Sequence, residues 1–306
     1  MSHHINHKHS HTEFFSVKPI LIALGLNSTF LIIELIGAIL TNSLALLADV
    51  GHMATDIIAL SIVLLAAYYS RKPKTSRHTY GFLRGEIVGA FLNGILLIII
   101  CGYIIYEAVH RLTITQEVSP HGVIILGIVG IIVNGISALV LYPGAKRNLN
   151  LRGAFLHLLS DALGSAGALF SGIIILFTQW YIADTLISLF IAILILRNAI
   201  PLIKESLQIL LEGTPKNIQI DMIEKDLRSL PYVADVHDLH VWLLNQNQYL
   251  LSCHLCLKTE YQTLESWESC LCEAERMLAV QYGIHHSTLQ VEPLDYRNNH
   301  SNHCQQ

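Results

Sequence analysis

Six long apolar runs limit what this chain can fold into. An α-helix rises about 1.5 Å per residue, so about 20 apolar residues span the roughly 30 Å hydrocarbon core of a bilayer. Only 14% of the residues are charged and 52% are hydrophobic, which lies outside the range of ordinary soluble domains. The sequence therefore predicts an α-helical membrane protein with six transmembrane helices, near residues 18–40, 43–69, 83–110, 120–142, 151–178 and 181–204.

Basic residues gather in two of the loops, near 70–84 and near 143–152. Lys and Arg concentrate in the short cytoplasmic loops of membrane proteins, so both loops are expected on the cytoplasmic side. With six spans, both termini are then cytoplasmic as well. We expect a multi-pass protein of the inner or plasma membrane.

After Pro201 the apolar runs give way to shorter mixed segments. Their periodicity predicts a small cytosolic α+β domain of metallochaperone-like αββαβ order, with a helix near 216–229, strands near 233–243 and 248–257, a helix near 263–281 and a strand near 285–292. Acidic residues outnumber basic ones in this part, which disfavours a nucleic-acid partner. The predicted division is a His-rich tail at 1–17, a transport domain at 18–205, a cytosolic domain at 206–295 and a flexible tail at 296–306.

Two His-x-x-x-Asp pairs, His52 with Asp56 and His157 with Asp161, lie inside the second and fifth apolar runs. Residues four apart share a helix face, and ionisable groups inside a membrane are costly and usually functional. One such pair could be a structural ion pair, but two pairs without Lys or Arg in the core of either helix favour a shared metal ion. Two imidazoles and two carboxylates suit tetrahedral Zn²⁺. Because these ligands must lose protons to bind metal, the pattern predicts exchange of metal for protons.

Two further carboxylates in the apolar runs each allow two interpretations. Asp49 shares a face with His52, so it either orients that imidazole or is a hydrated carboxylate at a helix end. Glu34 either lines the cation path or pairs with an asparagine, Asn27 or Asn134.

Three other sets of residues are given structural roles. Asp184 is expected at the membrane interface, near the outer end of the last helix. By strand alternation His240 faces away from His237 and is expected in the core beside Trp242. The cysteines lack the spacing of a disulfide framework or of paired CxxC ligands, and are expected to be reduced packing thiols, namely Cys253, Cys256, Cys270 and Cys272.

Two functions of other classes compete with transport. An integral-membrane zinc metalloenzyme would need an open position for water, whereas four ligands close the shell and no His-Glu-x-x-His is present. A membrane-anchored metal sensor would not need ligands inside the membrane. Both explain the paired motifs less well than an antiporter does.

The assembled pattern resembles the cation diffusion facilitator family, and its bacterial zinc-transporting branch in particular. The resemblance covers nearly the whole chain and includes LADVGH at 47–52, HTYGFLR at 78–84, HDLHVW at 237–242 and TLQVEP at 288–293. It implies a secondary active transporter and not an enzyme, which exports Zn²⁺, or Cd²⁺ and related ions, in exchange for protons. It also implies a homodimer whose cytosolic domains pair and bind regulatory Zn²⁺, with no organic cofactor.

By the same resemblance, four residues of the cytosolic domain are candidate metal ligands: His237, His254, His285 and Glu292. Without the family, each His would be an ordinary surface or strand residue. The loop between the second and third helices offers only His78, which either binds metal weakly or caps the helix expected to start near Tyr80.

Both tails carry weaker candidates. The N-terminal set is His3, His4, His7, His9 and His11, and the C-terminal set is His300, His303 and Cys304. A His-rich tract indicates weak metal capture, and the alternative is a solvated tail.

Overall fold

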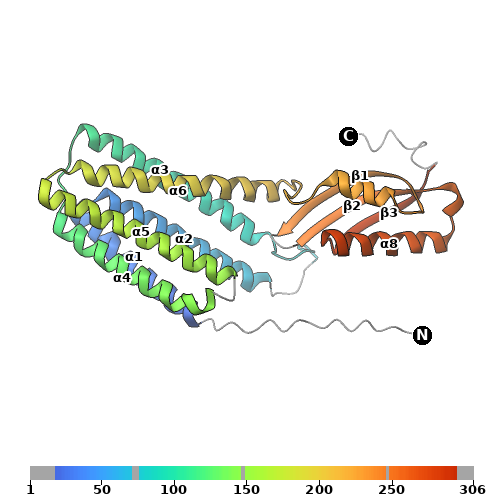
Figure 1. Ribbon diagram of the computed structural model, residues 1–306, viewed down its shortest axis with the longest axis horizontal. Coiled ribbons are helices and arrows are strands. Elements are labelled where there is room, and N and C mark those ends of the chain that lie inside the picture. Colours follow the sequence, from blue (N-terminus) through green and yellow to red (C-terminus); the bar gives the residue numbers. More distant parts are fainter. Residues whose placement is uncertain (1–17, 71–75, 146–148, 246–247, 295–306) are drawn as a thin grey trace. The chain divides into compact units, whose positions relative to one another are not determined.

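The computed structural model describes residues 18–70, 76–145, 149–245 and 248–294. Its first part consists of long helices (Figure 1), and nearly all of their ends lie within a few residues of the predicted ones. The helices are α1 (Lys18–Thr41), α2 (Leu44–Ser70), α3 (Gly85–Thr113), α4 (Pro120–Ala145), α5 (Leu149–Thr178) and α6 (Ile182–Leu210).

Among the described residues, five of these helices are long and apolar enough to cross a membrane: α1, α3, α4, α5 and α6. The remaining helix, α2, is 27 residues long and carries Asp49, His52 and Asp56 in its first half. Side chains in its C-terminal part lie outside the described set. The helical transmembrane architecture predicted from the apolar runs is confirmed.

Helices α4 and α5 approach each other closely because glycines of α4 face the backbone of α5 at Leu169 and the small side chain of Ser165. A Cβ on Gly127 would lie 2.8 Å from the Cβ of Leu169, and one on Gly130 would lie 2.5 Å from the hydroxyl of Ser165. Contacts this close exclude any larger residue at either glycine, as is usual where membrane helices pack through small residues. The backbone carrying His157 and Asp161 is thereby held against α4.

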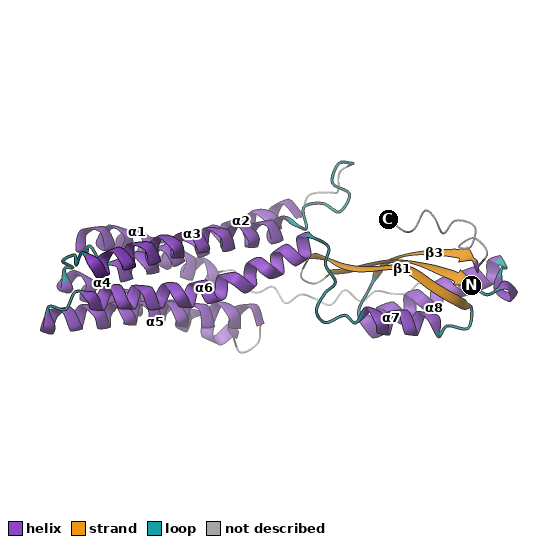
Figure 2. Ribbon diagram, turned by 90° about the horizontal axis from the view of Figure 1, so that it is seen from above, coloured by secondary structure: helices purple, strands orange, loops and turns teal. Residues whose placement is uncertain are grey.

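The C-terminal domain has the predicted αββαβ order. Its elements are α7 (Ile220–Arg228), β1 (Val233–Asn245), β2 (Gln248–Leu257), a short 3-10 helix (Thr259–Tyr261), α8 (Leu264–Tyr282) and β3 (His286–Pro293). The strand order is β1-β2-β3, with β1 and β2 antiparallel and β2 and β3 parallel. Because parallel strands need a crossover, α8 connects β2 to β3. Both α7 and α8 cover the same face of the sheet (Figure 2).

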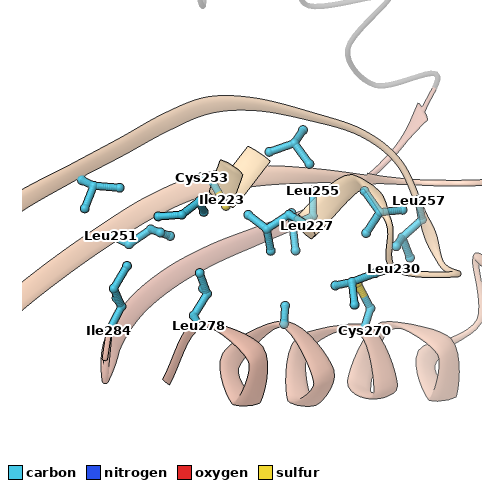
Figure 3. Packing of buried hydrophobic residues seen from close by; sticks show 14 residues of the cluster. Ile223, Leu227, Leu230, Leu251, Cys253, Leu255, Leu257, Cys270, Leu278 and Ile284 are labelled. Carbon is cyan, nitrogen blue, oxygen red and sulfur yellow. The ribbon is translucent and has the colours of Figure 1, made fainter. Parts of the chain in front are cut away.

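Alternation along β2 separates an apolar face from a polar one. Leu251, Cys253 and Leu255 point toward the helices and are fully or almost fully buried. They pack with residues of α7 and α8, such as Leu227 and Leu278, in one hydrophobic cluster (Figure 3). The opposite face of β2 therefore remains available for a binding site.

Candidate metal centres

The first candidate centre lies between α2 and α5, which carry His52 with Asp56 and His157 with Asp161. The ligand atoms of the four side chains lie within 4.8 Å of one another. Across the helices, Nε2 of His157 is 3.1 Å from Oδ2 of Asp56, and Nε2 of His52 is 3.7 Å from Oδ1 of Asp161. The structure thus brings together the four residues that the spacing singled out.

These separations suit a single tetrahedral ion. With metal–ligand bonds of about 2.0 Å, the ligand atoms of a tetrahedral zinc site lie roughly 3.3 Å apart. Three buried ligand atoms, Nδ1 of His52, Oδ2 of Asp56 and Oδ1 of Asp161, have no hydrogen-bond partner among the described residues. Buried polar atoms are normally satisfied, so a cation is the partner that this donor set fits.

The group is enclosed on one side only. The side chain of Asp161 is 4% exposed, whereas that of His157 is 42% exposed. His157 is therefore the most exposed of the four ligands and Asp161 the most deeply buried.

Behind this group, Asp49 is buried at 2% exposure and accepts a hydrogen bond from the hydroxyl of Ser165, over 3.1 Å. The interpretation of Asp49 as a hydrated helix-end carboxylate is therefore wrong. Its environment is the interface between α2 and α5, because Ser165 lies one turn beyond Asp161 on α5.

Glu34 on α1 is fully buried, with Asp49 and Asp161 as its ionisable neighbours. Neither of its oxygens has a hydrogen-bond partner among the described residues. The expected pairing with an asparagine is not observed: Asn27 donates to the hydroxyl of Ser137 over 3.2 Å, and Asn134 makes no side-chain hydrogen bond within the described chain.

Asp184, expected at the membrane interface, is fully buried among the described residues. Its carboxylate accepts hydrogen bonds from the hydroxyl of Ser43 and the backbone N–H of Leu44, both over 2.6 Å, and from the N–H of Ala45 over 3.3 Å. These groups form the first turn of α2, where free N–H groups and the helix dipole favour an anion. The position of Asp184 near the end of α6 was the basis of the expectation, but its carboxylate caps the start of another helix, α2.

The second candidate centre lies on the polar face of the C-terminal sheet. His237 on β1 is the register partner of His254 on β2. Nε2 of His237 is 2.6 Å from Oε1 of Glu292 on β3, and Nδ1 of His254 is 3.4 Å from Oε2 of the same carboxylate. This nitrogen of His254 is buried without a hydrogen-bond partner in the described residues, which fits a metal ligand.

The carboxyl group of Glu292 is favoured in its ionised form. Burial alone would favour the neutral acid, but hydrogen bonds from His237 and Cys256 and the nearby charges of His237 and His254 outweigh it. The pKa of Glu292 is therefore lowered from its usual value. A charged carboxylate is the form that binds a cation.

His285 is not part of this group in the single chain. It is exposed and precedes β3, at the opposite end of the strand from Glu292. Seven residues of extended chain separate the two by roughly 23 Å, at about 3.3 Å per residue. Of the four predicted ligands, His237 and Glu292 belong to one group of ligand atoms within 4.8 Å, and His254 contacts Glu292 beside it.

Cys256 joins the group although it was expected to be a packing thiol. Its ligand atom lies within 4.8 Å of those of His237 and Glu292, and its Sγ donates to Oε1 of Glu292 over 3.5 Å. Burial, followed by the hydrogen bond to Glu292 and its charge, raises the pKa of this thiol to about 12. One signal in the sequence could have found it: Cys256 follows His254 by two residues on a strand and so shares its face.

The other cysteines divide by position. Cys253 and Cys270 lie in the hydrophobic cluster as expected, and burial raises the pKa of the first to about 12 and of the second to about 11. Cys272 is exposed, so its assignment as a packing thiol is wrong. Two residues are about 200° apart around a helix, which turns Cys272 away from the core side that Cys270 faces.

The expected place of His240 in the core is also wrong, since its side chain is 63% exposed. The register of β1 and β2 shifts between His237 and His240, and Asp238 has a positive φ of 52°. Such a bulge inserts an extra residue and breaks strict alternation. Asp238 instead bonds to His240, over 3.0 Å.

His78 is exposed and packs against the ring of Phe82, with the ring centroids 4.6 Å apart. It belongs to neither group of metal-ligating side chains found in the described chain. The helix expected near Tyr80 begins at Gly85 instead, after a series of turns. The weak candidates in the two tails, His300, His303 and Cys304 among them, lie outside the described residues.

Membrane helices that bring metal donors together, followed by a cytosolic domain with a second donor group, define a multi-pass transporter of metal cations. The transmembrane domain of cation efflux proteins matches residues 20–211, and the cytoplasmic domain of cation efflux proteins matches residues 215–294. The chain therefore belongs to the cation efflux family, the cation diffusion facilitators. It is a transporter and not an enzyme, and its C-terminal domain is cytoplasmic.

Several relatives align over nearly their full length. The chain is 40% identical to the cadmium, cobalt and zinc/H(+)-K(+) antiporter of Bacillus subtilis (strain 168), covering 97% of this chain and 96% of that protein. It is 36% identical to the zinc transporter ZitB of Escherichia coli (strain K12), over 94% and 92%. It is 37% identical to the metal cation efflux system protein CzcD of Cupriavidus metallidurans, over 94% and 89%.

Among solved structures, the metal-bound C-terminal domain of the CzcD transporter is 32% identical. The match covers 24% of this chain and 99% of that one, with a TM-score of 0.22.

Proposed function

We propose that this protein exports Zn²⁺ from the cytoplasm in exchange for protons, through His52, Asp56, His157 and Asp161. The observation that carries the proposal is the set of cross-helix separations of 3.1 and 3.7 Å between nitrogen and oxygen ligands of α2 and α5. Nitrogen donors favour Zn²⁺ or Cd²⁺ over Mg²⁺, which prefers six oxygens. Zinc, cadmium and cobalt appear in the names of the relatives.

The same contacts explain how release of metal is linked to uptake of protons. Imidazole is the side chain whose ordinary titration lies near neutral pH. When the ion leaves, a proton on His157 gives this ring a charge that Asp56 can pair with over 3.1 Å. Metal and protons therefore compete for one set of atoms, and each stabilises the carboxylates in the absence of the other.

Glu34 and Asp49 belong to the path by which cations or protons reach this group. Both are buried in the transmembrane domain, and no Lys or Arg lies in the apolar core of α1 or α2 to neutralise them. Buried acids without a basic partner are costly in a membrane unless they carry protons or meet cations. Asp49 also ties α2 to α5 through Ser165, which supports the position of His52.

In the cytosolic domain, His237, His254 and Glu292 are proposed to bind a regulatory Zn²⁺. The cytosolic domains of two chains are also proposed to pair in a homodimer. The protein is proposed to lie in the plasma membrane, with both termini on the cytoplasmic side. Metal bound here would report the cytoplasmic zinc concentration to the transport domain.

Zinc flux into proteoliposomes tests the transport proposal. The wild-type protein and Asp161→Ala are compared with and without a pH gradient, while a pH dye in the lumen follows protons. We expect gradient-dependent zinc flux with opposite proton movement in the wild type, and a loss of about a hundredfold or more in the variant.

Asp221→Ala is the matched control, because it removes an exposed carboxylate from α7. It should transport like the wild type. Zinc flux that neither moves protons nor responds to the gradient would refute the exchange, and normal flux in Asp161→Ala would refute the site.

A further inference from the structure

Cys256 occupies an unusual place for a buried thiol. It is fully buried, yet it lies outside the hydrophobic cluster that contains Cys253 and Leu255 of the same strand. The even-numbered positions of β2 face away from the helices, so Cys256 shares the polar face with His254. Packing in the apolar core therefore does not account for a cysteine at this position.

The sheet register places this thiol directly beside the candidate ligands. Cys256 is the partner of Glu292 on the parallel strand β3, and His254 is the partner of His237 on β1. Sγ of Cys256 contacts the same oxygen of Glu292, Oε1, that Nε2 of His237 contacts over 2.6 Å. Three strands thus deliver sulfur, nitrogen and oxygen to one point.

A second observation points to a ligand at this spot. Nδ1 of His254 lies 3.4 Å from Glu292 and is buried without a hydrogen-bond partner in the described residues. The unpartnered nitrogen and the thiol approach the carboxylate from the same strand. A cation between them would satisfy both.

We propose that Cys256 is a sulfur ligand of the metal ion bound by His237, His254 and Glu292. The inference rests on the proposed regulatory site and adds to it the class of metal that the site prefers. Thiolate is a soft ligand, so the site would favour Cd²⁺ and Zn²⁺ over Mn²⁺ and Mg²⁺. The transport group contains no sulfur, so the two centres of one chain would rank metals differently.

The binding step is a substitution without redox change. The S–H bond breaks as a sulfur lone pair forms the bond to the metal, and the released proton passes to water. The thiolate and the Glu292 carboxylate then balance the two charges of the ion. This balance compensates for taking a divalent ion out of water into a partly buried site.

Cadmium titration of the purified full-length protein tests the proposal. Binding to a thiolate produces a ligand-to-metal charge-transfer band in the ultraviolet, which nitrogen and oxygen ligands do not give. The titration is done in a background of Cys101→Ala, Cys272→Ser and Cys304→Ser, which leaves Cys253, Cys256 and Cys270 as the thiols of the chain. The three remaining thiols all belong to the C-terminal domain, so the band reports only that domain.

Two alanine variants of the same strand are compared in that background. Cys256→Ala should abolish the band and weaken cadmium binding by the cytosolic domain about tenfold or more. Cys253→Ala, which removes a thiol from the apolar face of β2, should keep the band. An unchanged band in Cys256→Ala would overturn the proposal.

A failure of the proposed zinc–proton exchange can be told apart from a failure of the sulfur ligand. If zinc flux proves independent of protons while the band behaves as expected, only the exchange mechanism is refuted. If Glu292→Ala leaves the number of bound metal ions unchanged, the cytosolic site and its sulfur ligand are both refuted.

Should Cys256→Ala fail to fold, X-ray absorption of zinc bound to the intact cytosolic domain gives the answer. The measurement uses the full chain with Asp161→Ala, so that the transport group is disabled. One sulfur neighbour at about 2.3 Å per zinc supports the assignment, and a shell of nitrogen and oxygen alone overturns it.

Discussion

The two candidate centres both combine imidazoles with carboxylates, but on different kinds of scaffold. In the membrane, two helices each contribute a His and an Asp, and three of the ligand atoms have no hydrogen-bond partner in the described chain. In the cytosolic domain, three strands of one sheet contribute the ligands, and His237 already bonds Glu292 over 2.6 Å.

This difference in scaffold suits the two tasks that we propose for the centres, transport and regulation. Helices held only by side-chain packing can shift relative to each other, which changes the separation of ligands and allows an ion to be released. Strands joined by backbone hydrogen bonds keep their register, so their ligands stay in place. A site that must exchange its ion is expected on mobile elements, and a site that must sense ion concentration on rigid ones.

The largest difference between the centres should appear when one carboxylate is removed from each in turn. Asp56→Ala removes a ligand that contacts both His52 and His157, and should lower zinc flux about a hundredfold or more. Glu292→Ala should lower flux less than about tenfold, chiefly at low zinc concentration. Flux measured in proteoliposomes over a range of zinc concentrations checks both. Equal losses would break the distinction between a transport site and a regulatory site.

A large effect is also expected at the start of α2. Asp184→Ala leaves the hydroxyl of Ser43 and the N–H of Leu44 buried without an acceptor, which costs about 1–3 kcal/mol for each group. Zinc flux should fall because α2 carries His52, whereas Asp184→Asn, which keeps one acceptor oxygen, should fall less. Flux per folded protein, with the folded amount measured by size-exclusion chromatography, tests this. Normal flux in Asp184→Ala would show that the cap does not position the site.

The pH dependence of the cytosolic domain provides a third comparison. The pKa of Glu292 is lowered in the folded protein below its usual 4.5, so the stability it contributes is present above this pH. It is lost as pH falls through the lowered pKa. In metal-free protein, the urea midpoint of the domain should decline over this acid range, and Glu292→Gln should flatten the decline. An unchanged slope in the variant would contradict the ion-pair environment of Glu292.

The smallest effect is expected far from either centre. Thr263 caps α8 by accepting a hydrogen bond from the N–H of Ser266 over 3.2 Å. Thr263→Ala should destabilise the domain by about 1 kcal/mol, measured by urea denaturation. Because the cap contacts none of the ligands, zinc flux should remain normal. A loss of flux comparable to that of Glu292→Ala would mean that general stability, and not metal binding, controls the transporter.

The sequence predicted the helices and strands well because their patterns are long and regular. Apolar runs placed the membrane helices, and alternation placed β2 and β3 within a residue of their observed bounds. The His52 and His157 motifs were recognisable because helical spacing alone puts both members of each pair on one face.

The sequence was less informative where a contact depends on a distant element. Asp184 caps a helix that starts about 140 residues earlier, and no local pattern signals this pairing. His240 was misplaced because the bulge at Asp238 breaks the period of two. Cys256 was overlooked because a thiol between apolar residues resembles a core residue until its strand face is known.

The ligands of the cytosolic centre are synthesised in a fixed order, because the strand that pairs in parallel with β2, β3, comes last in the domain. His237, His254 and Cys256 leave the ribosome as a hairpin, but their shared carboxylate arrives only with β3, at the end of the domain. By then every membrane helix has already been translated. A nascent chain therefore completes the proposed ion pathway before the proposed regulatory site, and a message truncated after α8 would encode the membrane helices without the carboxylate of that site.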